Sequence, residues 1–182
     1  MSDTALLVID VQESFRHAPY WSEADVPLFM ERQQALIDGA VMQSIPVLQI
    51  FHTDGDKHFS LDSGFIKTLA PLSIKPDAVF YKNRHSALVG TGLDVWLTRH
   101  GIRRLIISGI RTEQCCETTT RHASDRGWDV DYVTEATLTF AMAHENGRTF
   151  TPAEIKTRTE LVLSKRFARI TTVKGALAGR AA

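Results

Sequence analysis

The sequence lacks the features that mark secreted, fibrous and membrane-inserted proteins. Only two of its 182 residues are cysteine, and a disulfide bond between the adjacent Cys115 and Cys116 would be strained. The first apolar run, Ala5–Ile9, is too short for a signal-peptide core and has no basic leader. Because nothing indicates export or membrane insertion, we expect two reduced thiols and a cytoplasmic protein.

An excess of charge of one sign is also absent, because 21 Lys and Arg residues balance 21 Asp and Glu residues. Such a chain offers no electrostatic footprint for nucleic acid or for an anionic membrane surface. Internal repeats, low-complexity segments and linkers rich in Pro, Gly or Ser are missing as well, so we expect one domain over residues 1–182. A chain of this length buries roughly 70 % of its unfolded surface, so its core requires neither a disulfide nor a metal.

Short apolar runs alternate along the chain with longer segments in which apolar residues recur at helical spacing. The predicted strands are Ala5–Ile9, Val47–Phe51, Ala78–Tyr81, Leu105–Ile107, Val130–Val133 and Ile170–Val173. The predicted helices are Pro27–Ile45, a helix that includes Leu93–Thr98, Glu113–Arg126, and a last helix that follows the capping box Thr151–Glu154 and runs to about Arg166. This alternation predicts an α/β protein with three α/β/α layers around a mostly parallel, Rossmann-like six-stranded sheet.

Ligands of such sheets bind at the carboxyl ends of the strands, and three chemically capable residues lie there. Asp10 follows the first strand, Lys82 follows the third, and Cys115 lies just beyond the fourth. Taken singly, the three residues read equally well as a loop cap, a surface lysine and a small core residue. Together they suggest an activated thiol, because the first turn of a helix favours a thiolate, a carboxylate takes a proton and an ammonium balances charge.

Three segments carry a family resemblance: Leu6–Gln12, Lys82–Leu88 and Gly109–Cys115. Their order and spacing resemble the signatures of the isochorismatase-like cysteine hydrolases, and the likeness extends from Asp10 to about Val133. That family includes nicotinamidases, N-carbamoylsarcosine amidohydrolases, ureidoacrylate amidohydrolases and isochorismatases.

The resemblance implies a catalytic triad of Asp10, Lys82 and Cys115. In that scheme Asp10 takes the thiol proton and later returns it to the leaving group, while Lys82 holds carboxylate and thiolate together and lowers the thiol pKa. Cys115 attacks a carbonyl carbon, and water hydrolyses the acyl-enzyme. The resemblance also implies a cis peptide bond between Ile110 and Arg111 and an oxyanion hole formed by the backbone N–H groups of Arg111 and Cys115.

The nucleophile has two candidates because the cysteines are adjacent. In the family the spacing from Gly109 and Thr112 leads to Cys115, and the next position is usually a small apolar residue. We therefore assign Cys115 as the nucleophile and expect Cys116 to be a core residue.

The loop after the second predicted strand raises the question of a metal. His52, His58 and Phe59 match a pattern of nicotinamidases in which an aspartate stands two residues before the first histidine, but Ile50 occupies that position here. Asp54 or Asp56 could supply the missing carboxylate. The alternative is a polar loop at the mouth of the site. We expect no cofactor, with a divalent metal at His52 and His58 as the alternative.

Candidate substrate contacts are weaker. Aromatic residues of the first loops, including Phe15 and Trp21, could form a wall, although burial statistics place Phe15 and Phe51 in the core and favour Trp21 as the contact. His52 could contact substrate instead of a metal. Arg84 and Arg111 could meet an anionic substrate or could be surface groups.

The sequence therefore predicts a metal-independent hydrolase that cleaves a C–N bond of a small amide, carbamoyl or ureido substrate through a thioester acyl-enzyme. One alternative is an isochorismatase, which hydrolyses a vinyl ether. The other is a non-catalytic protein of the same fold, or a redox sensor that uses Cys115 and Cys116. Because family members are commonly dimers or tetramers, we expect a homodimer or homotetramer whose only other partner is a small-molecule substrate.

Overall fold

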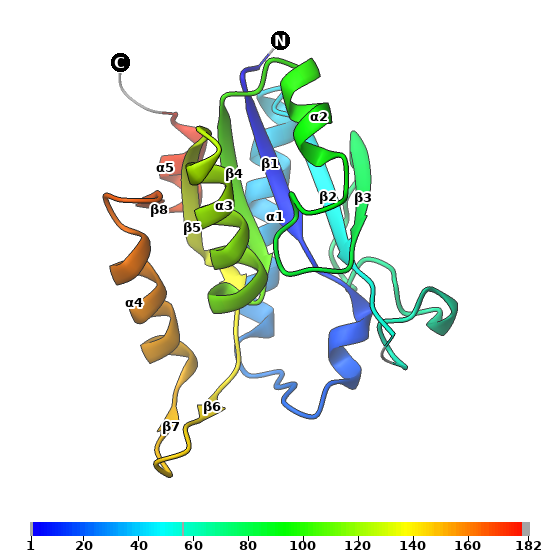
Figure 1. Ribbon diagram of the computed structural model, residues 1–182, viewed down its shortest axis with the longest axis vertical. Coiled ribbons are helices and arrows are strands. Elements are labelled where there is room, and N and C mark those ends of the chain that lie inside the picture. Colours follow the sequence, from blue (N-terminus) through cyan, green and yellow to red (C-terminus); the bar gives the residue numbers. More distant parts are fainter. Residues whose placement is uncertain (1, 56, 180–182) are drawn as a thin grey trace.

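The computed structural model describes residues 2–55 and 57–179, and its centre is a parallel sheet (Figure 1). Six strands of this described part pair in the order β3-β2-β1-β4-β5-β8, and every neighbouring pair is parallel. The strands are β1 (Thr4–Ile9), β2 (Val47–His52), β3 (Ala78–Lys82), β4 (Arg104–Ile110), β5 (Asp129–Leu138) and β8 (Arg169–Thr171). The predicted α/β class and six-stranded sheet are therefore confirmed.

Helices cover both faces of this sheet and give the three layers that were predicted (Figure 1). One face packs against α1 (Val26–Met42) and α5 (Val173–Leu177). The other packs against α2 (Leu93–Arg99), α3 (Glu117–Asp125) and α4 (Pro152–Leu163). Shorter helical turns are 3-10 helices at Glu13–His17 and Leu61–Ser63 and a π-helical turn at Thr112–Cys116.

The central strand β1 is buried on both faces because its side chains alternate between two cores. Leu6 and Val8 pack in the core beneath α1, and Leu7 and Ile9 pack in the core beneath α2 and α3. A continuous apolar run is what a strand covered on both faces requires. Because both faces of β1 are buried, its sequence is a continuous apolar run, and this run predicted the strand.

Several element boundaries differ from the prediction. Helix α1 ends at Met42 rather than Ile45, because Ser44 has a left-handed backbone with φ of 55°. Helix α4 begins at the predicted capping box but ends at Leu163 rather than Arg166, and Lys165 has φ of 62°. Both helices therefore end where a residue leaves helical backbone geometry.

Two features of the C-terminal part were not predicted. The last strand ends at Thr171, and Val173, expected in that strand, begins α5 because the Thr172 side chain accepts a hydrogen bond from the Gly175 amide. A small antiparallel hairpin, β6 (Met142–Ala143) and β7 (Thr149–Phe150), precedes α4. Strands of two residues carry too little alternation to be read from sequence.

The carboxyl ends of the three adjacent strands β1, β2 and β3 meet at one edge of the sheet. β1 ends directly before Asp10, and the ends of β2 and β3 pair His52 with Lys82. The π-helical turn that carries Cys115 follows β4 at the same edge. The fold therefore brings three distant segments of the chain to one place.

Gly109 has both a left-handed backbone and no space for a side chain. Its φ is 126°, and a Cβ atom there would lie 1.9 Å from the Ile9 carbonyl oxygen on the paired strand. We expect Gly109→Ala to lower the free energy of unfolding by at least about 2 kcal/mol, through backbone strain and overpacking together. Urea unfolding measures this loss.

Gly127 is the matched control for that substitution, because its φ of 90° is also left-handed but no atom lies within 4 Å of a Cβ there. Gly127→Ala therefore carries only the backbone strain, and its loss of stability should be the smaller of the two. Equal losses would show that the approach of β4 to Ile9 is not what requires glycine.

The length and apolar character of the described helices bear on whether they could cross a bilayer. Within residues 2–55 and 57–179, none combines sufficient length with sufficient apolar character to span a membrane.

Candidate active site

Asp10, Lys82 and Cys115 meet in the folded protein. The Lys82 Nζ atom lies 2.7 Å from Asp10 Oδ2 and 3.3 Å from Cys115 Sγ. The side chains of Asp10 and Lys82 are fully buried, and Cys115 is 6 % exposed. One ammonium therefore contacts a carboxylate and a thiol in an environment that excludes most water.

Local backbone geometry places each of these three side chains. Asp10 has φ of 53°, a left-handed conformation that aspartate tolerates better than most residues, and its amide donates to the Ile50 carbonyl. Lys82 is the last residue of β3, and its carbonyl accepts from the Thr53 amide at 2.7 Å. The carboxylate and the ammonium therefore start from backbone that is hydrogen-bonded to the neighbouring β2 region.

Two side chains of β5 hold the turn that carries the thiol. Thr112 donates from Oγ1 to the Thr137 hydroxyl at 2.8 Å, and its carbonyl accepts from the buried Tyr132 hydroxyl at 2.7 Å. Both cysteines of the turn are buried in the core beneath α2 and α3. They differ in their contacts, because the Lys82 ammonium donates to the Cys115 sulfur.

The surroundings of the Cys115 thiol favour its neutral form. Burial raises the pKa of Cys115 above its ordinary value, and the Asp10 carboxylate raises it further, whereas the Lys82 ammonium lowers it by less. The net direction is opposite to the expected lowering of the pKa, although the contribution of Lys82 has the expected sign. The expectation did not account for burial, which disfavours the charged form.

The neighbours of Lys82 favour its charged form. Burial would lower the pKa of Lys82, but the neighbouring Asp10 and Cys115 raise it above its ordinary value. The site is therefore an ammonium–carboxylate pair beside a neutral thiol. For the sulfur to attack, its proton must pass to a base, and the Asp10 carboxylate is adjacent.

His85 approaches the thiol and Tyr20 packs on Arg111, and neither residue was predicted from the sequence. His85 Nδ1 lies 3.8 Å from Cys115 Sγ, and His85 is exposed. Tyr20 stacks on Arg111, whose guanidinium carbon lies 4.6 Å from the ring centroid. Burial raises the pKa of Tyr20, and the charge of Arg111 opposes that shift. The available signals were the place of His85 inside the Lys82–Leu88 segment and that of Tyr20 beside Trp21.

Arg111 is nearly buried and already has an anionic partner. Its side chain is 9 % exposed, and its Nη2 atom lies 3.0 Å from Glu113 Oε1. The other carboxylate oxygen of Glu113 accepts from the Thr139 hydroxyl. The peptide bond between Ile110 and Arg111 is cis. Because Glu113 balances its charge, Arg111 does not present an unpaired cation to a ligand.

The remaining candidate contacts lie in three different places. Phe15 is 5 % exposed in the core beneath α1, which agrees with the burial alternative. Trp21 packs on Phe140 with ring centroids 5.2 Å apart and donates to Glu23. Arg84 is exposed and borders a groove of about 410 Å³ beside Thr53, Asp54 and Asn83. Of these, Arg84 is the one beside the end of β3 that carries Lys82.

His52 and His58, the two candidate metal ligands, have other partners in the structure. His52 Nδ1 lies 3.1 Å from Lys82 Nζ, and His52 Nε2 lies 3.1 Å from Asp54 Oδ2. The His58 ring stacks on His17 with centroids 4.8 Å apart. Among the described residues no group of three His, Cys, Asp or Glu side chains could hold a metal ion. Asp56 lies outside these residues.

This arrangement does not fit the ligand set that the nicotinamidase pattern implies. Ile50 stands in place of the aspartate and is fully buried in the core. A cation bound at His52 Nδ1 would face the Lys82 ammonium, which would repel it. We therefore derive no step of the chemistry through a metal.

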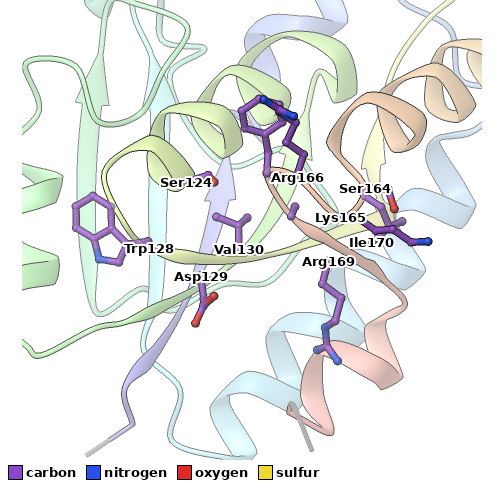
Figure 2. Close-up of a pocket in the computed structure, with 11 residues that line it drawn as sticks. Ser124, Trp128, Asp129, Val130, Ser164, Lys165, Arg166, Arg169 and Ile170 are labelled. Atoms are coloured by element: carbon purple, nitrogen blue, oxygen red, sulfur yellow. The ribbon is translucent and has the colours of Figure 1, made fainter.

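A larger cavity lies away from these residues, at the amino-terminal end of β5. Its volume is about 560 Å³, and Figure 2 shows that its lining comes from the end of α3, the start of β5 and the connection from α4 to β8. Its lining includes Ser124, Trp128, Asp129 and Arg166 but none of Asp10, Lys82 and Cys115. It is therefore distinct from the site at the carboxyl ends of the strands.

Comparison of the sequence with known proteins gives one consistent family. The family model "Isochorismatase domain" matches residues 4–172. The isochorismatase family protein YrdC of Bacillus subtilis is 28 % identical over 172 residues, which cover 92 % of this chain and 91 % of the relative. Nicotinamidase 3 of Arabidopsis thaliana is 32 % identical over 152 residues, which cover 75 % of this chain and 73 % of the relative.

Solved structures share the fold. A cysteine hydrolase from Pseudomonas syringae pv. phaseolicola 1448A matches with a TM-score of 0.88 and 19 % identity, over 98 % of this chain and 93 % of that chain. An isochorismatase-like hydrolase from Alkaliphilus metalliredigens matches with a TM-score of 0.80 and 21 % identity, over 97 % of this chain and 98 % of that chain. At such identities the likeness shows a common architecture.

Proposed function

The chain belongs to the isochorismatase family, and from this premise we propose that it is a cysteine hydrolase that cleaves the C–N bond of a small amide, carbamoyl or ureido substrate. Its triad is Asp10, Lys82 and Cys115. One observation carries the proposal: the fully buried Lys82 ammonium contacts the Asp10 carboxylate at 2.7 Å and the Cys115 thiol at 3.3 Å. Nucleophile, base and charge-balancing group are then within reach of one reacting carbon.

The first half of the proposed reaction forms the acyl-enzyme. Cys115 Sγ bonds to the substrate carbonyl carbon while the thiol proton moves to Asp10. The backbone N–H groups of Arg111 and Cys115 donate to the carbonyl oxygen as it becomes negative; one such donor is typically worth about 2.7–4 kcal/mol of barrier. The C–N bond then breaks, and Asp10 returns the proton to the departing nitrogen.

The second half releases the acid. Water attacks the thioester carbon, Asp10 takes a proton from the water, and the carbon–sulfur bond breaks. The proton on Asp10 returns to the sulfur, which restores the neutral thiol. Lys82 stays protonated throughout and stabilises whichever neighbour is negative. No cofactor is required, because the chain itself supplies every group that moves a proton.

The alternative functions have less support from the site. An isochorismatase hydrolyses a vinyl ether, a reaction for which the thiol beside a carboxylate and an ammonium has no evident role as nucleophile. A redox sensor that pairs two thiols needs both to be accessible, and Cys116 is fully buried. Thiol-dependent hydrolysis uses all three residues of the triad.

A substrate panel tests the proposal directly. We expect ammonia or amine release from at least one member of a panel of primary amides, carbamoyl compounds, ureides and nicotinamide. The control is the same protein after iodoacetamide has alkylated Cys115, which should release none. Intact mass spectrometry should also detect the acyl-enzyme. Failure of every class of compound, or equal release by alkylated protein, would contradict the proposal.

A further inference from the structure

The Lys82 ammonium has three N–H donors, and three acceptors surround it. Asp10 Oδ2 lies at 2.7 Å, His52 Nδ1 at 3.1 Å and Cys115 Sγ at 3.3 Å from Nζ. The Lys82 side chain is fully buried, so water is a poor substitute for any of the three. A buried ammonium with an unmatched donor is costly. His52 therefore completes the hydrogen bonding of the group at the centre of the triad.

Two neighbouring segments hold the backbone of His52 in this place. Gln12, which is fully buried two residues after Asp10, accepts from the His52 amide at 2.8 Å and donates to the His52 carbonyl at 3.0 Å. The register of β2 with β3 also pairs His52 with Lys82. The loop that carries the carboxylate and the strand that carries the ammonium therefore both fix the position of this histidine.

One neutral tautomer of the His52 ring allows both of its nitrogens to form hydrogen bonds. Nδ1 faces the ammonium, which can only donate, so Nδ1 accepts and the ring proton lies on Nε2. Nε2 lies 3.1 Å from Asp54 Oδ2, which can accept a hydrogen bond from the Nε2–H group. Burial and the charge of Lys82 lower the pKa of His52 below its ordinary value. The neutral ring that an acceptor requires is therefore the favoured form.

From these contacts we propose that His52 is a positioning residue, which accepts the third N–H of Lys82 and so holds the ammonium between Asp10 and Cys115. The inference rests on the proposed function for the role of Lys82 in turnover. Without this acceptor the ammonium turns toward other partners, and the thiolate that forms during attack loses part of its stabilisation. His52 acts through Lys82 and touches no reacting atom.

The experiment uses the alkylation of Cys115 by iodoacetamide, which requires no knowledge of the substrate. We expect His52→Leu to lower the second-order rate constant by about 10- to 100-fold at every pH between about 6 and 9, because a charged hydrogen bond in a buried site is lost. His52→Asn should recover most of the rate, because an amide oxygen can take the place of Nδ1 as acceptor. Once a substrate is known, kcat should fall in His52→Leu with little change in KM.

His58→Leu distinguishes positioning from metal binding. A metal held by both histidines would make the two leucine variants equally damaging, whereas positioning makes His52→Leu alone slow. Circular dichroism and thermal unfolding identify a variant that has lost its fold, and the His52→Asn variant keeps the inference testable in that case. An unchanged alkylation rate in folded His52→Leu, no recovery in folded His52→Asn, or equal losses in both leucine variants would overturn the inference.

The outcomes also separate this inference from the proposed function. If no amide is hydrolysed but His52→Leu still slows alkylation, the positioning of Lys82 holds and the proposed reaction fails. If hydrolysis is found and His52→Leu alkylates as fast as the unmodified chain, the reaction holds and the positioning role fails.

Discussion

Replacing Cys115 by alanine is expected to reduce hydrolysis by a factor of about 10³ or more, because the acyl-enzyme can no longer form. Cys115 is the thiol within 3.3 Å of the Lys82 ammonium, and the Asp10 carboxylate beside it can take its proton. The measurement is ammonia or amine release at saturating substrate, together with intact mass spectrometry of the protein during turnover. The acyl adduct should be absent from the variant.

Cys116→Ala is the matched control, because it removes the same atom type from the adjacent position. Cys116 is fully buried in the core, so this change should cost some stability through a small cavity while turnover stays within a few fold. Full turnover in Cys115→Ala, or loss of turnover only in Cys116→Ala, would show that the nucleophile has been assigned to the wrong cysteine.

Lys82→Met is expected to affect stability and activity together. The ion pair of Lys82 with Asp10 is fully buried on both sides, and removal of one partner of such a pair typically costs about 3–5 kcal/mol because the other charge is left uncompensated. Methionine retains most of the apolar length of the side chain. Urea unfolding should show this loss, and ammonia release should fall by at least about 100-fold because the thiolate loses its cation.

The double variant Asp10→Asn with Lys82→Met separates these two effects. Removing both charges together takes away the uncompensated carboxylate, so much of the stability should return. Activity should not return, because neither the base nor the cation is present. A double variant no more stable than Lys82→Met would contradict the buried pairing of these two side chains.

The meeting of Asp10, Lys82 and Cys115 could be predicted because all three residues lie where strands end in the sequence, while their catalytic roles stay a proposal. Asp10 follows a continuous apolar run, and Lys82 ends a short apolar stretch, so the rule that ligands bind at the carboxyl ends of parallel strands brought them together. The structure places the three side chains in contact. The cytoplasmic location, the single domain over residues 1–182, the absence of a cofactor and the homodimer or homotetramer stay predictions.

Other parts of the site could not be predicted because they depend on side-chain direction. Trp21 was favoured over Phe15 and Phe51 as a substrate contact and stays a prediction, while the stacking of Tyr20 on Arg111 was not predicted. His52 was predicted as a weak substrate contact or metal ligand, and the contacts of its ring with Lys82 and Asp54 were not predicted. The sequence order of a loop does not say which way its side chains turn.

By itself, the sequence determined the alternation of strands and helices, the capping box at Thr151 and the location of the site at the strand ends, because these follow from local periodicity and spacing. Only the tertiary structure decided that the Cys115 pKa is raised and that His52 completes the shell of Lys82. Those two properties depend on burial and on contacts between residues far apart in the chain. Burial penalises the charge of the thiolate, and the same burial makes each hydrogen bond to the Lys82 ammonium matter.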